Sequence, residues 1–599
     1  MKVNKYKHLL KFAVLLVFFF ISIELLARAG GGGGSDSGGG DGGGLVELIF
    51  YLLLSLPFPY NIISVLILIF IIIIFNKKLK QNSVLNKIPS VQNLKSNNSY
   101  LNFKEKNPDF IDEYFKRKVD IAFFNIQYAW MSQNTGKIRK FISDGVYQRF
   151  NVQFIMMKKL KQRNELSNIK LHSITIIDYK SDGQYDVIDV ALHSSMNDKF
   201  ICEKMPQLNQ NVSESFVEYW SFIKKSGFTS YDIYENPNCP QCGAAIPELE
   251  GEVAICPYCK ATINSGDFDW VLSEITQADD YTYSTARAHK QANLHQKIAN
   301  IHAVDPFFSV QKLEDKASNA FLQYSIAEAL RNPLLVRRFM QKEAYDDFEE
   351  SVKSSPAILY NRLYLNDVSL ISAWDESDFD YLGFYVRKSY QRIQMKQDNP
   401  EEIDSIKDPV VRTSSFVIVL CRKKGAKPPK GMLYTHQCPN CGGTLSDSTD
   451  IKCPYCDSEL NSPDFEWVVE NVYTLGKYKE RISNNASDNI LSFNIDKADD
   501  LLDVRDYAFN NTLIIMASDG DFSYEEELFA KELAKKLKYN PSKINSAIEL
   551  AKNKKLVLRM PDDSKKHPKI IRLMEKAAMA DEKMTESEKE ILNYVKSNF

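Results

Sequence analysis

The chain lacks an excess of charge of either sign, and it lacks the common catalytic signatures. Its 75 Lys and Arg residues nearly balance its 77 Asp and Glu residues, so overall charge gives it no affinity for the phosphate backbone of a nucleic acid. The sequence contains no Gly-x4-Gly-Lys-Ser/Thr phosphate loop, no His-Glu-x-x-His motif and no Gly-x-Ser-x-Gly elbow. Its 8 His residues are scattered. These absences favour a protein that is not an enzyme.

The chain of 599 residues is long enough for roughly three to five domains, but its start is unlike a globular domain. Residues 1–29 begin with several Lys, continue with an apolar stretch and end at Ala27-Arg28-Ala29, a small-x-small cleavage site. This pattern predicts a signal peptide, with an uncleaved signal anchor as the alternative. Residues 30–44 are mostly Gly and predict a flexible extracytoplasmic linker.

Residues 45–76 form a second apolar stretch. The part from 55 to 75 is close to the ~20 residues that a bilayer core requires, which predicts a transmembrane segment. Basic residues follow at once within 77–80. Because positive charge stays on the cytoplasmic side of a membrane, we expect the rest of the chain to be cytoplasmic. The basic linker 77–106 either holds anionic lipid or serves only as a topology signal.

Eight of the 10 Cys residues fall in four C-x-x-C pairs. A cytoplasmic location disfavours disulfides, and paired thiolates at this spacing are typical of tetrahedral zinc, with a redox pair or an iron–sulfur cluster as the alternative. Four thiolates leave no open position on the ion, so we expect two structural zinc ribbons, at 236–263 and 436–460. The predicted zinc ligands are Cys239, Cys242, Cys256 and Cys259, and Cys438, Cys441, Cys453 and Cys456.

Charge around the two predicted ribbons disfavours a nucleic-acid partner. Only Lys260 and Lys452 are basic residues near the cysteine pairs. The loops carry acidic residues instead, among them Glu248 and Asp447. Contact with phosphate requires basic side chains, so we expect no binding of nucleic acid. The two remaining cysteines, Cys202 and Cys421, are predicted to be small buried hydrophobic residues.

The ribbons belong to a longer duplicated unit. With an offset of 198 residues, Arg139, Phe141, Tyr147 and Phe150 fall on Arg337, Phe339, Tyr345 and Phe348. An offset of 197 matches NSGDFDWVL, which begins at Asn264, with NSPDFEWVV, which begins at Asn461. This period is too long for a solenoid repeat, so it predicts two related domains, at 107–304 and 305–480.

Each predicted domain begins with an amphipathic helix and continues with strands. Phe115, Val119 and Ala122 are spaced by three and four residues, as on one helical face. The runs LHSITIIDYK, DVIDVALHS and FVEYWSFIKK in the first copy, and VSLISAW and SSFVIVLCRKK in the second, predict an antiparallel sheet in each domain. We expect a ribbon after each sheet, followed by a short helix that contains Trp270 or Trp467. The aromatic faces predict a core, with a ligand pocket as the alternative.

Four motifs resemble the bacterial relatives of the mitochondrial import-motor subunit Tim44: NPDF at a helix start, the EYWSFIKKSG strand, CPQCG with CPYC, and SGDFDWVLSEI. The resemblance covers about residues 107–275 and, more loosely, 305–472, where the EYW triplet is missing. It implies an α+β fold of two cone-shaped domains similar to nuclear-transport-factor-two-like domains. In mitochondria that domain associates with the membrane and tethers a chaperone to the translocon, but nothing in this sequence matches the chaperone-binding segment.

Residues 505–599 predict an all-α domain with two acidic turns, MASDGDFSYEE and MADEKMTESE, that lead into helices. Both turns have the Ser/Thr-x-x-Glu spacing of a capping box. The alternative is a divalent metal site, although the Gly of an EF-hand loop is missing. The acidic residues of that alternative site are Asp519, Glu526, Asp581 and Glu588. The duplicated turn resembles the TerB domain of tellurite-resistance proteins, which implies a compact helical domain associated with membrane stress systems.

These features predict a scaffold or adaptor without enzymatic activity, anchored to the inner membrane of a bacterium and acting in protein transport or membrane stress response. We expect it to contact the membrane, anionic lipid, and cytoplasmic or membrane proteins that the sequence does not identify. Two zinc ions are the expected cofactors. The alternative is a small-ligand sensor or enzyme that uses the cavity of one cone-shaped domain.

Overall fold

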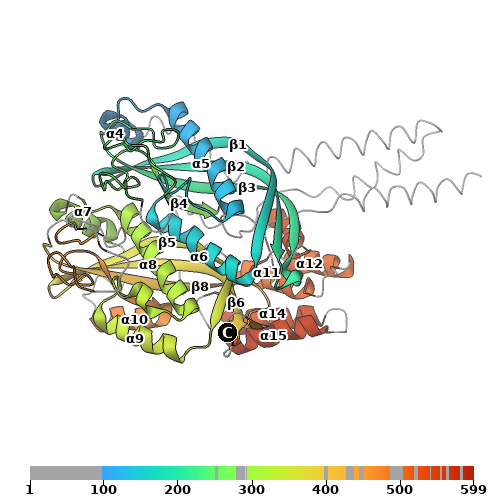
Figure 1. The fold of residues 1–599 in the computed structure, drawn as a ribbon. Coiled ribbons are helices and arrows are strands. Elements are labelled where there is room, and N and C mark those ends of the chain that lie inside the picture. Colours follow the sequence, from blue (N-terminus) through green and yellow to red (C-terminus); the bar gives the residue numbers. More distant parts are fainter. Residues whose placement is uncertain are drawn as a thin grey trace, which may run out of the picture.

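The computed structural model describes residues 98–599 with several gaps (Figure 1). The gaps are 250–253, 278–290, 292, 306, 397–398, 400–401, 427–436, 444, 446–450, 486–503, 519–521, 523, 538, 540, 553–555, 562–565 and 580–583. The predicted signal (1–29), Gly-rich linker (30–44) and transmembrane segment (45–76) lie outside the described residues, as does most of the basic linker. Among the helices that the structure does describe, none has the length and apolar character needed to cross a membrane.

The first unit packs helices on a four-stranded antiparallel sheet (Figure 1). Its helices are α4 (Asn98–Lys106), α5 (Asp112–Ser132) and α6 (Asp144–Leu160). Its strands, in sheet order, are β1 (Gln162–Asp182), β2 (Tyr185–Cys202), β3 (Gln210–Lys225) and β4 (Val271–Gln277). The predicted first helix and the predicted strand runs of the first copy are confirmed.

The sequence pattern explains how α5 and α6 form and pack. Phe115 and Val119 of α5 are buried, and the Phe115 ring lies 5.4 Å from that of Phe222 on β3, edge to face. At the start of α6, the Ser143 hydroxyl accepts a hydrogen bond of 3.1 Å from the backbone N–H of Val146. That bond satisfies one of the free N–H groups of a helix N-terminus. The core of the first unit therefore lies between these helices and the sheet.

The second unit repeats this order of elements. It contains α7 (Leu294–Val304), α8 (Val310–Leu330) and α9 (Lys342–Ser354), then β5 (Ile358–Glu376), β6 (Phe379–Met395), β7 (Ile403–Ile406), β8 (Arg412–Lys423), β9 (Val468–Thr474) and α10 (Leu475–Asn485). The sheet order is β5-β6-β8-β9, and the short β7 pairs with β6 off this path. The helix and strands predicted for the second copy are confirmed. The described part of the chain is thus an α+β protein with two antiparallel sheets.

The predicted helices at Trp270 and Trp467 are wrong. Each Trp directly precedes a strand, β4 or β9, which is the last strand of its sheet. Leu272 pairs with Phe222 of β3, and Val469 pairs with Leu420 of β8. Spacing along the chain could not predict these strand pairings, because a ribbon separates the two paired strands in the sequence. Each ribbon is therefore inserted between the last two strands of its sheet, β3 and β4 in the first unit and β8 and β9 in the second, and does not follow the sheet.

Equivalent hydrogen bonds recur in the two units. The backbone N–H of Leu272 donates to the carbonyl of Phe141 at 2.9 Å, and that of Val469 donates to the carbonyl of Phe339 at 2.6 Å. The Asn264 amide donates to the carbonyl of Ile142 at 2.9 Å. In the second unit, the Asn461 amide donates to the carbonyl of Met340 at 3.2 Å. The two units thus join their helical layer to their last strand in the same way.

The two units contact each other where α6 packs against α8 and β5 (Figure 1) and where the β1–β2 hairpin meets the start of α8. Asp182, at the end of β1, accepts hydrogen bonds from the N–H groups of Val310 and Gln311 at 2.9 and 2.8 Å. A residue of the first unit thereby caps the N-terminus of a helix in the second. Gly183 follows with φ +65°, and a Cβ at this position would lie 2.3 Å from the carbonyl oxygen of Phe308. The hairpin tip therefore requires Gly for this close approach.

The described part of the C-terminal region is mostly helical, and it contacts the second unit (Figure 1). They are α11 (Val504–Met516), α12 (Tyr524–Leu537), α13 (Pro541–Lys552), α14 (His567–Ala578) and α15 (Glu586–Asn598). The N–H of Leu558, between α13 and α14, donates to the carbonyl of Val411 at 2.8 Å. The Tyr594 hydroxyl of α15 donates to Asp408 at 2.6 Å. The helical region is thus tied to the start of β8.

Candidate metal centres

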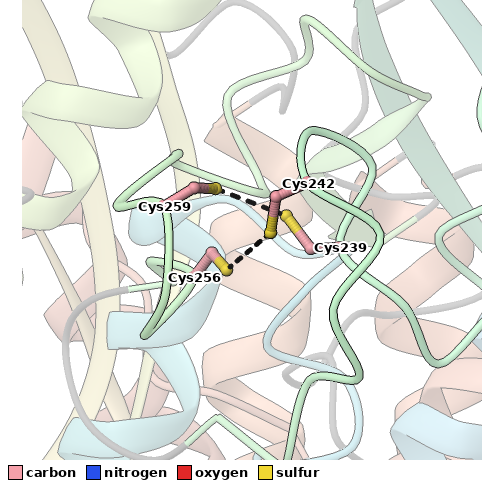
Figure 2. A group of neighbouring side chains, drawn as sticks. All are labelled: Cys239, Cys242, Cys256 and Cys259. Carbon is pink, nitrogen blue, oxygen red and sulfur yellow. Dashed lines mark hydrogen bonds between the residues drawn. The ribbon is translucent and has the colours of Figure 1, made fainter.

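The first predicted cysteine set converges on one point between two loops (Figure 2). Its four sulfur atoms all lie within 4.8 Å of one another. The Sγ atoms of Cys239 and Cys259 are 3.7 Å apart, and those of Cys242 and Cys256 are 3.8 Å apart. A disulfide requires about 2.05 Å, so these thiols are free. The structure therefore brings together all four predicted ligands.

Local backbone turns position these sulfurs. In each C-x-x-C pair the residue after the second Cys donates its N–H to the carbonyl of the first: Gly243 to Cys239 at 2.9 Å and Lys260 to Cys256 at 3.0 Å. Both donors have positive φ, 74° and 64°. The N–H of Gln241 also points at the sulfur of Cys239, 3.4 Å away. This tight turn directs both sulfurs of a pair to the same side.

The second cysteine set has the same geometry. Cys438 and Cys456 have sulfur atoms 3.7 Å apart, as do Cys441 and Cys453. All four sulfurs again lie within 4.8 Å of one another. Burial raises the pKa of the Cys453 thiol. The Ser458 hydroxyl is 2.9 Å from the sulfur of Cys456, and this hydrogen bond, together with the Ser458 backbone N–H, lowers the pKa of the Cys456 thiol to about 6. A lowered pKa favours the thiolate, which is the form that binds metal.

The sulfur distances fit the size of a zinc ion. Zn–S bonds of about 2.3 Å in a tetrahedron place neighbouring sulfurs about 3.8 Å apart. The Sγ–Sγ distances of Cys239–Cys259, Cys242–Cys256, Cys438–Cys456 and Cys441–Cys453 are 3.7 or 3.8 Å. Each set offers four sulfur ligands and so could complete a tetrahedral site. A metal held this way has no position left for substrate or water.

Each centre is joined to the core of its unit. Cys239 and Cys256 are buried in the hydrophobic core of the first unit, and Cys438 and Cys453 in that of the second. Next to the first ribbon, the ring of Tyr234 stacks on Phe141 with a centroid distance of 4.7 Å. Structural metal sites contribute directly to folding energy. Binding of metal at these sites would therefore stabilise the sheets as well as the ribbons.

A buried ion pair that was not predicted from the sequence lies beside each ribbon. Lys118 of α5 contacts Asp269, directly before Trp270, with an N–O distance of 2.6 Å and side-chain exposures of 4% and 0%. The equivalent Lys316 of α8 contacts Glu466, directly before Trp467. Burial raises the pKa of Asp269, although Lys118 opposes that shift. The offsets of 198 for the lysines and 197 for the acids were the signal that could have revealed these pairs.

The structure describes only part of the alternative metal site in the C-terminal region. Asp519 and Asp581 lie outside the described residues. Glu526 lies in the first turn of α12. The Glu588 carboxylate accepts hydrogen bonds from the N–H and the hydroxyl of Thr585 at 2.7 and 3.0 Å. Thr585 and Glu588 thus form the predicted capping box of α15.

Comparison with protein families identifies a Tim44-like domain at residues 96–235. This match runs through α4, α5, α6 and the first three strands. It ends before Cys239, so it includes neither cysteine set. No curated protein matches the chain.

Proposed function

We propose that this protein is a scaffold or adaptor without enzymatic activity that works at the bacterial inner membrane. The Tim44-like domain at 96–235 supports an adaptor role. The apolar stretch at 45–76, followed by basic residues, supports an anchor with the body of the chain in the cytoplasm. Protein transport or membrane stress response is the setting that the two family resemblances suggest.

The observation that carries this proposal is the closed geometry of the two cysteine sets. Sulfur pairs 3.7–3.8 Å apart, in sets whose four sulfurs all lie within 4.8 Å of one another, suit a structural zinc ion. One cysteine of each pair is packed into a core, where a metal would brace the sheet. Zinc in this role holds a surface in shape and carries out no chemistry. A rigid body that presents surfaces is what a scaffold requires.

We further propose that the second unit, within 305–480, is another Tim44-like domain and that 505–599 form a TerB-like domain. The repeated hydrogen bonds of the two units support the first assignment. The helical content of the C-terminal region supports the second. In this arrangement the three parts form one body, because α8 is capped by the first unit and α15 is bonded to Asp408 of the second.

The ribbons offer a matched pair of candidate contact residues. Tyr258 and Tyr455 occupy the same place in the two CPYC motifs, and they are 66% and 68% exposed. Exposed aromatic side chains are frequent anchors at protein interfaces. We propose that these two tyrosines contribute to binding of a protein partner.

Crosslinking in the native membrane, with mass spectrometry of the products, tests this function. We expect defined protein adducts of the full chain, and we expect Tyr258→Ala with Tyr455→Ala to reduce them severalfold. Tyr128→Ala is the matched control, because Tyr128 is 59% exposed but lies on α5. An adduct pattern that matches that of an unrelated membrane protein would contradict the proposed adaptor role. Equal loss in the Tyr128 variant would contradict only the ribbon contact.

A further inference from the structure

An open cavity of about 760 Å³ lies between the two units. One wall is the β1–β2 hairpin of the first unit, with Lys180 and Asp182. The other wall belongs to α7, α8 and β5 of the second unit, with Leu294, Ile298 and Leu370. A volume of about 300–1,000 Å³ is typical of sites that hold a small molecule. The cavity is distinct from the metal centres and needs both units to form.

Comparison of the two units explains why this space is open. In the first unit α4 covers the equivalent place with Tyr100 and Phe103, whose rings lie 5.1 and 4.8 Å from the ring of Tyr179. An offset of 198 places Ile298 of α7 at the position of Tyr100. The last residue pair before the turn of each hairpin is Asp182–Tyr185 in the first unit and Glu376–Phe379 in the second. When the two hairpins are aligned on these pairs, Ala373 takes the position of Tyr179. The rings that fill the first unit are therefore missing from the second.

The carboxylates of the cavity are already satisfied. Asp182 accepts hydrogen bonds from Ser309, Val310 and Gln311 at 2.7–2.9 Å, and the helix N-terminus offsets its charge. Glu314 accepts a bond of 2.9 Å from the N–H of Leu370. These groups have little capacity left for a ligand that donates hydrogen bonds.

The Gln291 side chain keeps one hydrogen-bond donor free in the cavity. Gln291 lines the cavity with only 3% of its surface exposed, and its Oε1 accepts a bond of 2.9 Å from the N–H of Ala373. That bond fixes the orientation of the amide, and Nε2 is buried without a hydrogen-bond partner among the described residues. His302, a second lining residue, has its Nε2 atom 3.8 Å from Asp182, and its buried Nδ1 has no partner in the described part of the chain; that nitrogen donates or accepts according to the tautomer of the ring. A buried donor without a partner is costly unless a ligand completes it.

We propose that this cavity binds a small amphipathic molecule whose oxygen-bearing head accepts hydrogen bonds. The head faces the Gln291 amide, and the apolar body lies against Leu294, Ile298 and Leu370. Such a ligand contacts both units, so its binding strengthens their association. This activity is additional to the proposed adaptor role and does not depend on the ribbons.

Titration calorimetry of the full chain in lipid nanodiscs tests the proposal, with dodecanoate and dodecyltrimethylammonium as probes of equal chain length. Heats from empty nanodiscs are subtracted. We expect saturable binding of dodecanoate and at least tenfold weaker binding of the ammonium probe, which accepts no hydrogen bond. Gln291→Leu removes a hydrogen bond to a charged acceptor and should weaken dodecanoate binding about tenfold.

Two variants block the cavity itself. Ile298→Tyr copies the residue of the first unit, and Ala299→Trp changes an exposed lining residue without touching the core. Both variants should abolish saturable dodecanoate binding. If circular dichroism shows that Ile298→Tyr does not fold, the result for Ala299→Trp alone tests the proposal. Val304→Tyr, on the same helix and 79% exposed, should bind normally. The proposal is overturned if dodecanoate does not bind, if Ala299→Trp binds it normally, if Gln291→Leu is without effect, or if both probes bind equally.

Discussion

The buried ion pair beside the first ribbon gives a sharp prediction. Replacing Lys118 by Met leaves the Asp269 carboxylate buried without its cation, and breaking a buried pair in this way costs about 3–5 kcal/mol. The N–H groups of Trp270 and Ile233 still donate to Asp269, at 2.9 and 3.3 Å. We therefore expect a cost of about 3 kcal/mol, at the lower end of that range.

Hydrogen–deuterium exchange measures this cost locally. The amide of Leu272 is bonded to the carbonyl of Phe141 next to the ion pair, so its exchange reports the opening of this region. A loss of about 3 kcal/mol corresponds to exchange that is roughly 100-fold faster. Lys116→Met is the matched control, because Lys116 pairs with Glu113 on the same helix while their side chains are 30% and 80% exposed. That variant should cost less than about 1 kcal/mol.

The pH dependence provides a second check on the same variant. Burial already raises the pKa of Asp269 in the presence of Lys118, and removal of the lysine raises it further. A carboxyl whose pKa is raised on folding favours the folded state at low pH, so the loss caused by Lys118→Met should shrink as pH falls. Lys118→Met with Asp269→Asn should recover most of the stability. If Lys118→Met exchanges no faster than Lys116→Met, the buried pair does not stabilise this region.

Three further predictions concern the metal and the contact between the units. The full chain should contain two zinc ions by elemental analysis and Cys256→Ser one, with the remaining ion in the second ribbon; unchanged zinc in the variant would contradict the assignment. Gly183→Ala should loosen the contact between the units and speed proteolysis there, because its Cβ meets Phe308, whereas Gly425→Ala, with similar φ and open surroundings, should not. Desolvation raises the pKa of Asp315 to about 7 where it meets Ser143, so its ionisation should destabilise the contact as pH rises from about 4 to 7. Asp315→Asn should flatten that dependence, and an unchanged profile would refute the assignment.

The metal ligands could be predicted from sequence because their spacing is local. Two residues between paired cysteines are enough to set the turn that aims both sulfurs, and the structure brings together all eight predicted ligands. Most of the strands before the ribbons were predicted for a similar reason, since runs of β-branched and aromatic residues are local in the chain. The strands β6 and β7 of the second unit were not predicted. Cys202 and Cys421 are buried, as predicted.

The features that the sequence analysis missed depend on partners far along the chain. A short helix was predicted at Trp270, where the structure has the strand Val271–Gln277, because the pairing of this strand with β3 lies across the first ribbon. Lys118 lies within an apolar helical face, and only the fold shows that Asp269 meets it. The cavity could not be predicted because Ala373 stands where the first unit has Tyr179. These two residues are 194 positions apart, whereas the offset that matches the helices of the two units is 198. That change in offset becomes visible only when the two hairpins are aligned by their strand pairing.

The insertion of each ribbon between the last two strands of its sheet links metal supply to aggregation. The strand after the ribbon, β4 or β9, covers one edge of its sheet, and the ribbon brings that strand back to its partner across a long connection. A metal that ties this connection together lowers the entropy lost when the loop closes. Without metal, the final strand would detach more readily and expose the backbone of β3 or β8. An uncovered strand edge pairs with other chains, so zinc starvation would produce aggregated protein and not merely a looser ribbon.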